Sequence, residues 1–231
     1  MGGATYVIMA YFVVEGYKYT SNLKKYIGRL LIVGLIAHAF HPTVLGSTAI
    51  MGNGLIINIL FTISLSLFVL YMYDKIKIRV LFWVLFVVAC IVALFMDLIF
   101  IGILVPLLYY TIKNENHRRW VPGVVSGVIW GVLGVLAGLV PIMYMATGAF
   151  AEEVHDIAAM QGLTIELLAA MPSFAIGCFV AAMLIRNYNG DRGKPAKWLF
   201  YVAYPLHLAI IAAIMVLLGI ASFNLFGFIQ F

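Results

Sequence analysis

Long stretches without a charged residue dominate this sequence. Asp, Glu, Lys and Arg are absent from residues 4–14, 30–73, 80–96, 98–112, 120–151, 167–185 and 198–231. An α-helix needs about 20 apolar residues to cross a hydrocarbon core about 30 Å thick, and most of these stretches are that long. Hydrophobic residues make up 65% of the chain and charged residues 10%, far from the balance of a soluble domain. The sequence therefore predicts an all-α integral membrane protein, and it excludes a soluble globular domain, a disordered chain and a collagen-like fibre.

The stretch 30–73 is long enough for two helices. Its middle carries His41-Pro42 and the turn-forming run 46–54, which favour a reversal of the chain. We therefore expect a helical hairpin, with helices at about 30–45 and 55–73.

Residues 80–112 divide in the same way around Asp97, because one helix of that length would overshoot the bilayer. Pro106 is expected to bend the second of these two helices. Residues 120–151 also exceed one straight span, and we expect the chain to leave the hydrocarbon core at Pro141. The total is about eight transmembrane helices in a bundle that forms a single domain over residues 1–231.

The basic residues predict how the helices are oriented. All fourteen Lys and Arg residues lie in the first, third, fifth and seventh connections, as Lys18, Lys24, Lys25 and Arg29, then Lys75, Lys77 and Arg79, then Lys113, Arg118 and Arg119, then Arg186, Arg192, Lys194 and Lys197. The other connections, around 41–54, at Asp97 and over 152–166, contain none. Basic connections stay in the cytoplasm, so we predict a multi-pass protein of the cytoplasmic membrane. This order places Met1 outside without a signal-peptide pattern, and we therefore expect that a further helix precedes Met1 in the full-length protein.

Residues 18–29 form an amphipathic cytoplasmic segment. Lys18, Asn22, Lys25 and Arg29 recur at spacings of four, three and four, with tyrosine or leucine one position later. This spacing predicts a helix that lies in the membrane interface. Its basic face fits either anionic lipid headgroups or the phosphates of a cytosolic donor such as coenzyme A.

Several strongly polar side chains lie at membrane depth, where each is a functional candidate because it needs a partner or a water-filled cavity. Counting about 1.5 Å per residue, Glu15 and Arg29 lie near the cytoplasmic face, His38 and His207 near the middle, and His41, Asn58 and Asp97 towards the outer face. They are compatible with one polar track between the two faces, or with unrelated helix ends and satisfied hydrogen bonds between helices.

His207 is a candidate general base. Pro205 removes a helical hydrogen bond beside it, and a neutral imidazole accepts a proton near neutral pH. His38 and His41 are spaced to share a helix face, but the sequence offers no third ligand at a suitable spacing, so no metal site is expected.

Residues 12–32, FVVEGYKYTSNLKKYIGRLLI, resemble the signature block of the TraX family of bacterial membrane proteins. Similar blocks follow in the family's order, as Asn58 to Thr62, Asp97 with Gly102, Phe200-Tyr201, and Tyr204 to Leu208. The resemblance runs from about residue 3 to about residue 219. The matching positions are Glu15, Gly16, Tyr17, Thr20, Asn22, Tyr26, Arg29, Asn58, Thr62, Asp97, Tyr204, Pro205 and His207.

The resemblance implies a polytopic acetyltransferase of the bacterial inner membrane. Founding members act in conjugation and acetylate the N-terminal amine of a pilin subunit, and the family is similar to multi-helix membrane acyltransferases that use acyl-CoA. Members usually carry a preceding helix with a Met-x-x-Asp-His element, and this chain begins after it. The resemblance thus agrees with the expectation of a missing first helix, whose histidine is another candidate base.

We therefore predict an acyltransferase that moves acetyl, or a similar small acyl group, from acyl-CoA to an amine or a hydroxyl. Acetyl-CoA is the expected donor. The predicted donor-binding residues are Arg29, Lys25, Tyr26 and Tyr17.

The predicted catalytic residues are His207, which deprotonates the acceptor, and Glu15 or Asp97, which orients the proton path. The predicted substrate-binding residues are Asn58, Thr62, Tyr204 and His38, and of these Tyr204 or Asn58 is the expected oxyanion donor. The expected partners are the lipid bilayer, the acyl donor and an acceptor protein or envelope glycan, without nucleic acid. The alternatives are a small-solute transporter or export partner that uses the same polar track, and an assembly scaffold.

Overall fold

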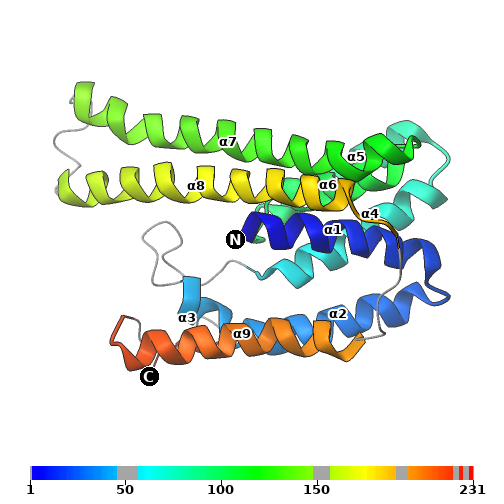
Figure 1. Cartoon of the computed structure of the whole chain (residues 1–231), viewed down its shortest axis with the longest axis horizontal. Helices are drawn as coiled ribbons and strands as arrows, with labels where there is room; N and C mark the ends of the chain where they lie inside the picture. The colour runs from blue at the N-terminus through cyan, green and yellow to red at the C-terminus, as the bar shows by residue number, and fades with distance from the viewer. Residues whose placement is uncertain are drawn as a thin grey trace. The chain divides into compact units, whose positions relative to one another are not determined.

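The protein is built from α-helices. A computed structural model describes residues 2–45, 57–147, 157–190, 197–220, 224–225 and 229–230 (Figure 1). Within these residues the helices are α1 (Gly2–Tyr19), α2 (Leu23–His38), α3 (His41–Leu45), α4 (Ile59–Lys75), α5 (Arg79–Ala93), α6 (Ile101–Thr111), α7 (Glu115–Thr147), α8 (Ile157–Arg186) and α9 (Lys197–Leu217). One antiparallel pair of two-residue strands, β1 (Asn224–Leu225) and β2 (Ile229–Gln230), follows α9. The all-α prediction is confirmed for the described part of the chain.

The chain divides into two compact units, which are described separately. Unit 1 comprises Met1–Tyr11 and Ile112–Asn189, and unit 2 comprises Phe12–Thr111 and Gly190–Phe231. The single domain over residues 1–231 stays a prediction.

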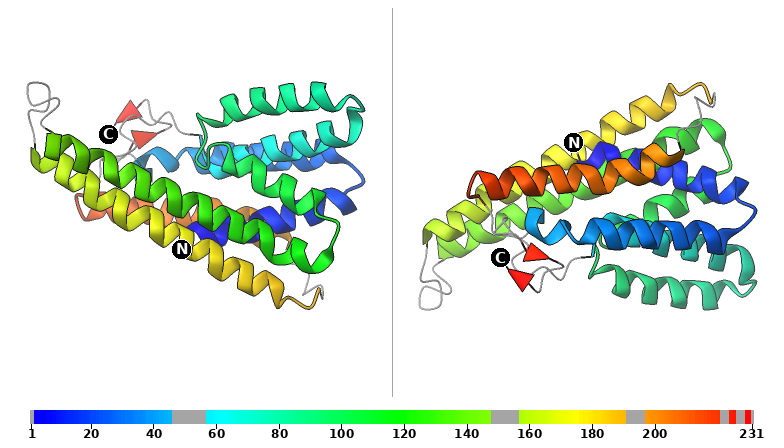
Figure 2. Two further views of the ribbon diagram at one scale, coloured as in Figure 1. Left: turned by 90° about the horizontal axis from the view of Figure 1, so that it is seen from above. Right: turned by 90° about the horizontal axis from the view of Figure 1, so that it is seen from below.

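Unit 1 is dominated by the long helices α7 and α8, which lie side by side in every view (Figures 1 and 2). Glycines on α7 face α8 so closely that a Cβ on Gly123 would lie 2.9 Å from the Ala182 Cβ, and one on Gly134 would overlap Met171. The residue numbers rise on α7 while they fall on α8, so the two helices are antiparallel. Small residues allow this approach, as they do where helices pack in membranes.

Helix α7 continues past Pro141 to Thr147. That the chain leaves the hydrocarbon core at Pro141 stays a prediction. Proline removes one hydrogen bond but does not always end a long helix.

Unit 2 is organised around α4. Ten of its 17 residues are buried: Ile59, Leu60, Thr62, Ile63, Ser64, Ser66, Leu67, Val69, Leu70 and Met72. Helices α2, α5 and α6 pack against α4, and α9 packs against α2 and α3. By contrast, α5 buries only Phe82, Ala89 and Ala93 among its 15 residues. Helix α4 is therefore the core of this unit, and α5 is its periphery.

The predicted interfacial helix over residues 18–29 is not one helix. Helix α1 ends at Tyr19 and α2 begins at Leu23. The Asn22 side chain accepts a hydrogen bond of 2.9 Å from the backbone N–H of Lys25, and such a cap starts a new helix. The basic residues that share a face in the sequence pattern are therefore divided between the end of α1 and the first turns of α2.

Each of the eight predicted apolar segments overlaps one of the longer helices, but the helix lengths leave the number of membrane spans unconfirmed. In the described residues one helical segment, Glu115–Leu139, is both long and apolar enough to cross a membrane. The apolar helical segments Arg79–Ala93, Ile101–Thr111, Ala170–Arg186 and Tyr201–Leu217 are shorter, at 10–17 residues each. The run 46–54, which we expected to form the turn of the first hairpin, lies outside the described residues.

Candidate functional site

A histidine and an aspartate meet inside unit 2. The Nε2 atom of His41 lies 3.1 Å from Oδ2 of Asp97, although the two residues are 56 positions apart in the chain. The His41 side chain is 5% exposed and the Asp97 side chain 23% exposed. An ionised carboxylate accepts only, so the imidazole donates Nε2–H to it, and Nδ1 is then the basic nitrogen of the ring. This tautomer is the one that a general base needs.

The ends of four helices bring this pair together. His41 is the first residue of α3, and Asp97 lies in the turn between α5 and α6. The backbone N–H of Asp97 donates to the carbonyl of Ile57, just before α4, at 3.0 Å, and the N–H of Ile57 donates to the carbonyl of Phe95 at 3.0 Å. This isolated bridge fixes the α5–α6 turn against the start of α4.

Asn58 is fully buried and holds the backbone beside the pair. Its side-chain oxygen accepts from the N–H of Leu60 at 3.1 Å, and its Nδ2 donates to the carbonyl of Gly34 at 2.7 Å. The first bond caps α4 and the second ties α4 to α2. Because its Nδ2 is already bonded, Asn58 is placed for a structural role.

Tyr204 extends the cluster from α9. Its hydroxyl interacts with the backbone N–H of Ile59 and with the Asp97 carboxylate. Its ring lies edge-on to the ring of His207, with centroids 5.2 Å apart. We name His38, His41, Asn58, Asp97 and Tyr204 the His41 cluster.

His38 completes this cluster, and Thr62 borders it. The His38 ring lies 5.7 Å from the His41 ring and 6.3 Å from the Phe61 ring, centroid to centroid. Thr62 is fully buried, and in the described part of the chain its hydroxyl has no hydrogen-bond partner. A Cβ added to Gly102 would overlap the Thr62 methyl group, so α6 starts in close contact with α4.

The predicted base, His207, lies differently. Its residue is exposed on α9, and its Nδ1 lies 3.1 Å from the carbonyl of Ala203, one turn earlier in the same helix. Its role as base stays a prediction, but the geometry favours His41 because only His41 has a carboxylate within hydrogen-bonding distance among the described contacts.

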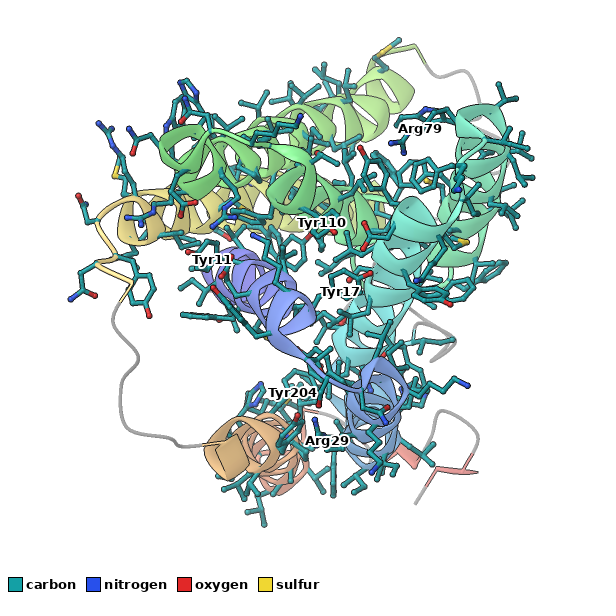
Figure 3. All side chains as sticks on the ribbon, turned by 90° about the vertical axis from the view of Figure 1, so that its right-hand side faces the viewer. Tyr11, Tyr17, Arg29, Arg79, Tyr110 and Tyr204 are labelled. Atoms are coloured by element: carbon teal, nitrogen blue, oxygen red, sulfur yellow. The ribbon has the colours of Figure 1, made fainter. Side chains whose placement is uncertain are left out.

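A second polar cluster lies where α1, α4 and α6 end. Asp74 accepts a hydrogen bond from the hydroxyl of Tyr17 at 2.7 Å, and its two oxygens lie 2.7 and 2.9 Å from the hydroxyl of Tyr110. Figure 3 shows Tyr17 beside Tyr110, and their ring centroids are 5.5 Å apart. Burial, followed by the bond to Asp74, raises the pKa of Tyr17. We name Tyr17, Asp74 and Tyr110 the Asp74 cluster.

Sequence reasoning missed Asp74 and Tyr110. In the sequence Asp74 marks only the end of a long apolar stretch, because its partners lie 57 and 36 positions away. Tyrosines near the ends of neighbouring apolar stretches are the signal that was available.

The predicted donor-binding residues lie at the start of α2 and the end of α1. Glu15 forms an ion pair of 3.1 Å with Lys18. Tyr26 packs against Gly16, where an added Cβ would lie 2.9 Å from its hydroxyl. Burial raises the pKa of Tyr26 to about 12, and neighbouring Tyr201 adds to the rise while Arg29 opposes it.

Thus the structure sorts the predicted site residues into two groups within unit 2. His38, Asn58, Thr62, Asp97 and Tyr204 gather with His41, whereas Glu15, Tyr17, Lys25, Tyr26 and Arg29 lie at the end of α1 and in the first half of α2. Along α2, Arg29 and Lys25 precede His38 by about 14 Å and about 20 Å. No group of three or more His, Cys, Asp or Glu residues that could hold a metal ion occurs in the described ranges.

The fold and the cluster define a class, an apolar helical protein with a part-buried histidine–aspartate pair. The model of the family described as TraX protein matches residues 2–215, and the chain belongs to the TraX family. It is 25% identical over 233 aligned positions to a "Probable fimbrial assembly protein FimC, serogroup H1" of Dichelobacter nodosus, with 92% of this chain and 80% of that protein covered. No solved structure matches the chain.

Proposed function

We propose that this protein is a multi-pass acyltransferase of the bacterial inner membrane, which moves acetyl or a similar small acyl group from acyl-CoA to an amine or hydroxyl. The observation that carries the proposal is the part-buried contact between His41 and Asp97, with the hydroxyl of Tyr204 near enough for the Asp97 charge to act on it. Membership of the TraX family supports the same reaction class.

The exposed surface of α5 supports a membrane location. Ten large apolar side chains on and just after this helix are exposed: Val80, Leu81, Trp83, Val84, Val87, Val88, Ile91, Val92, Leu94 and Phe95. Such a surface is a liability in water and is normal against lipid tails. The basic residues before α5 and at the start of α2 then mark the cytoplasmic side.

In the proposed reaction His41 is the general base. It takes the proton from the acceptor N–H or O–H, and the freed electron pair attacks the thioester carbonyl. The carbon–sulfur bond then breaks, and the departing thiolate receives the proton from the imidazolium, which yields free coenzyme A. Asp97 holds the ring tautomer and stabilises the imidazolium.

Tyr204 is the proposed oxyanion donor. Asn58, the other candidate from the sequence, already donates to the Gly34 carbonyl. The Tyr204 hydroxyl instead accepts a hydrogen bond from the backbone N–H of Ile59. Its own proton can therefore be donated to a carbonyl oxygen that becomes negative in the transition state.

The donor is proposed to enter from the basic end of unit 2. Lys25 and Arg29, with Tyr17 and Tyr26, bind the phosphates and the adenine base of the donor. The thioester then has to reach the His41 cluster, which lies about 14–20 Å from Arg29 and Lys25 along α2. An acyl donor with a long flexible arm meets this requirement, whereas a compact acyl phosphate does not.

The acceptor class is proposed from the relative. The name of the Dichelobacter nodosus protein, a probable fimbrial assembly protein, supports a subunit of a surface fibre as the acceptor, with its amine or a hydroxyl as the acylated group. An envelope glycan is the competing acceptor.

The test is acyl transfer by the purified protein in lipid vesicles. Radiolabelled acetyl-CoA is supplied on one side, together with either a pilin subunit or envelope glycan, and the label is followed into the acceptor and into free acetate. We expect labelled acceptor from the native protein. Intact donor with every acceptor would contradict the proposal, and passage of a small solute across the same vesicles would then favour a transporter.

A further inference from the structure

Ile99 adopts an unusual backbone conformation two residues after Asp97. Its φ is 44°, and in the described ranges it is the only residue other than glycine with a positive φ. A β-branched side chain is strongly disfavoured in this left-handed region because its Cβ crowds the backbone. Such a conformation persists only where the surrounding structure enforces it, often at functional sites.

The contacts of the turn show what enforces it. Upstream of Ile99, the backbone N–H of Asp97 is bonded to Ile57 at 3.0 Å, and the Asp97 carboxylate is bonded to His41 at 3.1 Å. Downstream, the N–H of Gly102 bonds to the carbonyl of Leu98 at 3.1 Å as α6 begins. The chain must therefore reverse between two anchored points, and the left-handed residue makes that reversal.

Close packing removes the room for a wider turn. Leu98 is 5% exposed and Ile101 is fully buried, and α6 begins in contact with Thr62 of α4 at Gly102. A longer path for the chain would pull one of these side chains out of the core. The same hydrogen bonds and packing contacts thus impose both the left-handed backbone of Ile99 and the position of Asp97.

We propose that Ile99 is a positioning residue, whose left-handed backbone holds the Asp97 carboxylate against His41. Glycine adopts the same φ without strain, but it also adopts many others. The branched side chain restricts the backbone, so once the turn is formed Asp97 has little freedom to move. The structural part of this inference stands alone, and its effect on catalysis rests on the proposed function.

The structural part is tested by a double-mutant cycle on thermal unfolding. The changes His41→Ala and Asp97→Asn are made singly and together, in the native background and in Ile99→Gly. We expect Ile99→Gly to unfold at the same temperature as the native protein or higher, and the coupling between His41 and Asp97 to fall to roughly half or less. Ile99→Ala is the matched control, since it shortens the side chain but keeps the Cβ that restricts the backbone, and it should keep most of the coupling.

The catalytic part is tested by steady-state transfer with the same variants. Ile99→Gly should lower kcat about tenfold or more and leave KM for the acyl donor unchanged, because misplacing a catalytic group by about 1 Å costs up to about a hundredfold. Ile99→Ala should lower kcat less.

Unchanged coupling in the Ile99→Gly background would overturn the inference, and so would equal effects of the glycine and alanine variants. If the native protein transfers no acyl group, the proposed function fails, and the thermal cycle still decides whether Ile99 positions Asp97.

Discussion

Gly102 is the position where the packing of α6 on α4 is easiest to test. In Gly102→Ala the new Cβ would overlap the methyl group of Thr62 and lie 2.9 Å from the Cβ of Leu98. Thr62 is fully buried and stiff at its first side-chain torsion, so it cannot swing away. Either α6 or α4 has to move.

The magnitude follows from two opposing terms. Overpacking a close-packed core costs about 1–3 kcal/mol, and replacing glycine by alanine in a helix gains up to about 1 kcal/mol. The overlap with the buried Thr62 methyl group places the overpacking cost in the upper part of its range, at about 2–3 kcal/mol. Subtracting a gain of about 1 kcal/mol leaves a net loss of about 1–2 kcal/mol. In a chain of this size 1 kcal/mol corresponds to about 2–4 °C in Tm, so we expect the Tm of the detergent-purified protein to fall by about 2–8 °C.

Two further variants make the test specific. Gly28→Ala is the matched control, because Gly28 lies inside α2 and an added Cβ there meets nothing within 4 Å, so its Tm should rise slightly. Thr62→Ser removes the clashing methyl group and should restore part of the Tm lost in Gly102→Ala. A Gly102→Ala protein as stable as the native one would refute the close packing of α4 and α6.

Three other predictions concern the remaining polar residues. Asp74→Asn removes the carboxylate that accepts hydrogen bonds from the hydroxyls of Tyr17 and Tyr110. Because the site is exposed, it should lower the free energy of unfolding by only about 1 kcal/mol. Glu115→Gln, in a surface ion pair, is the control and should leave Tm unchanged. Asn58→Ala removes the side-chain donor to the buried Gly34 carbonyl and the acceptor for the Leu60 N–H, and it should cost about 1–3 kcal/mol in the same unfolding assay. No loss would contradict the assigned cap. Lys25→Gln with Arg29→Gln should raise KM for acyl-CoA about tenfold at low salt and less at high salt, and an equal effect at both would argue against charge-based donor binding.

The positions of the helices were predictable because the sequence carries them as local signals. Uncharged stretches such as 80–96 and 98–112 contain α5 and α6, with Asp97 in the turn between them. Hydrophobic periodicity also placed a helix over residues 18–29, but it did not register that Asn22 caps a new helix. The Asn22 side chain favours the start of a new helix over continuation of the first one, and hydrophobic periodicity alone does not indicate such a cap.

The candidate site was only partly predictable because its geometry depends on distant residues. Depth along the helices places His41 and Asp97 among the polar residues in an apolar context, but it gives no reason to prefer that pair over His207. Their contact spans 56 positions and depends on the α5–α6 turn, whose strained residue Ile99 has no sequence signature. Tertiary packing, and not local preference, decides such a contact.

The most direct test of the central claim compares three histidine variants in acyl transfer from acetyl-CoA. His41→Ala removes the base paired with Asp97, His207→Ala removes the exposed histidine of α9, and His117→Ala, at the exposed start of α7, is the control. We predict that His41→Ala loses at least about a hundredfold in kcat, as expected for a general base, and that the other two variants keep most of the native rate. Full activity in His41→Ala, or a comparable loss in His207→Ala alone, would contradict the assignment of the base.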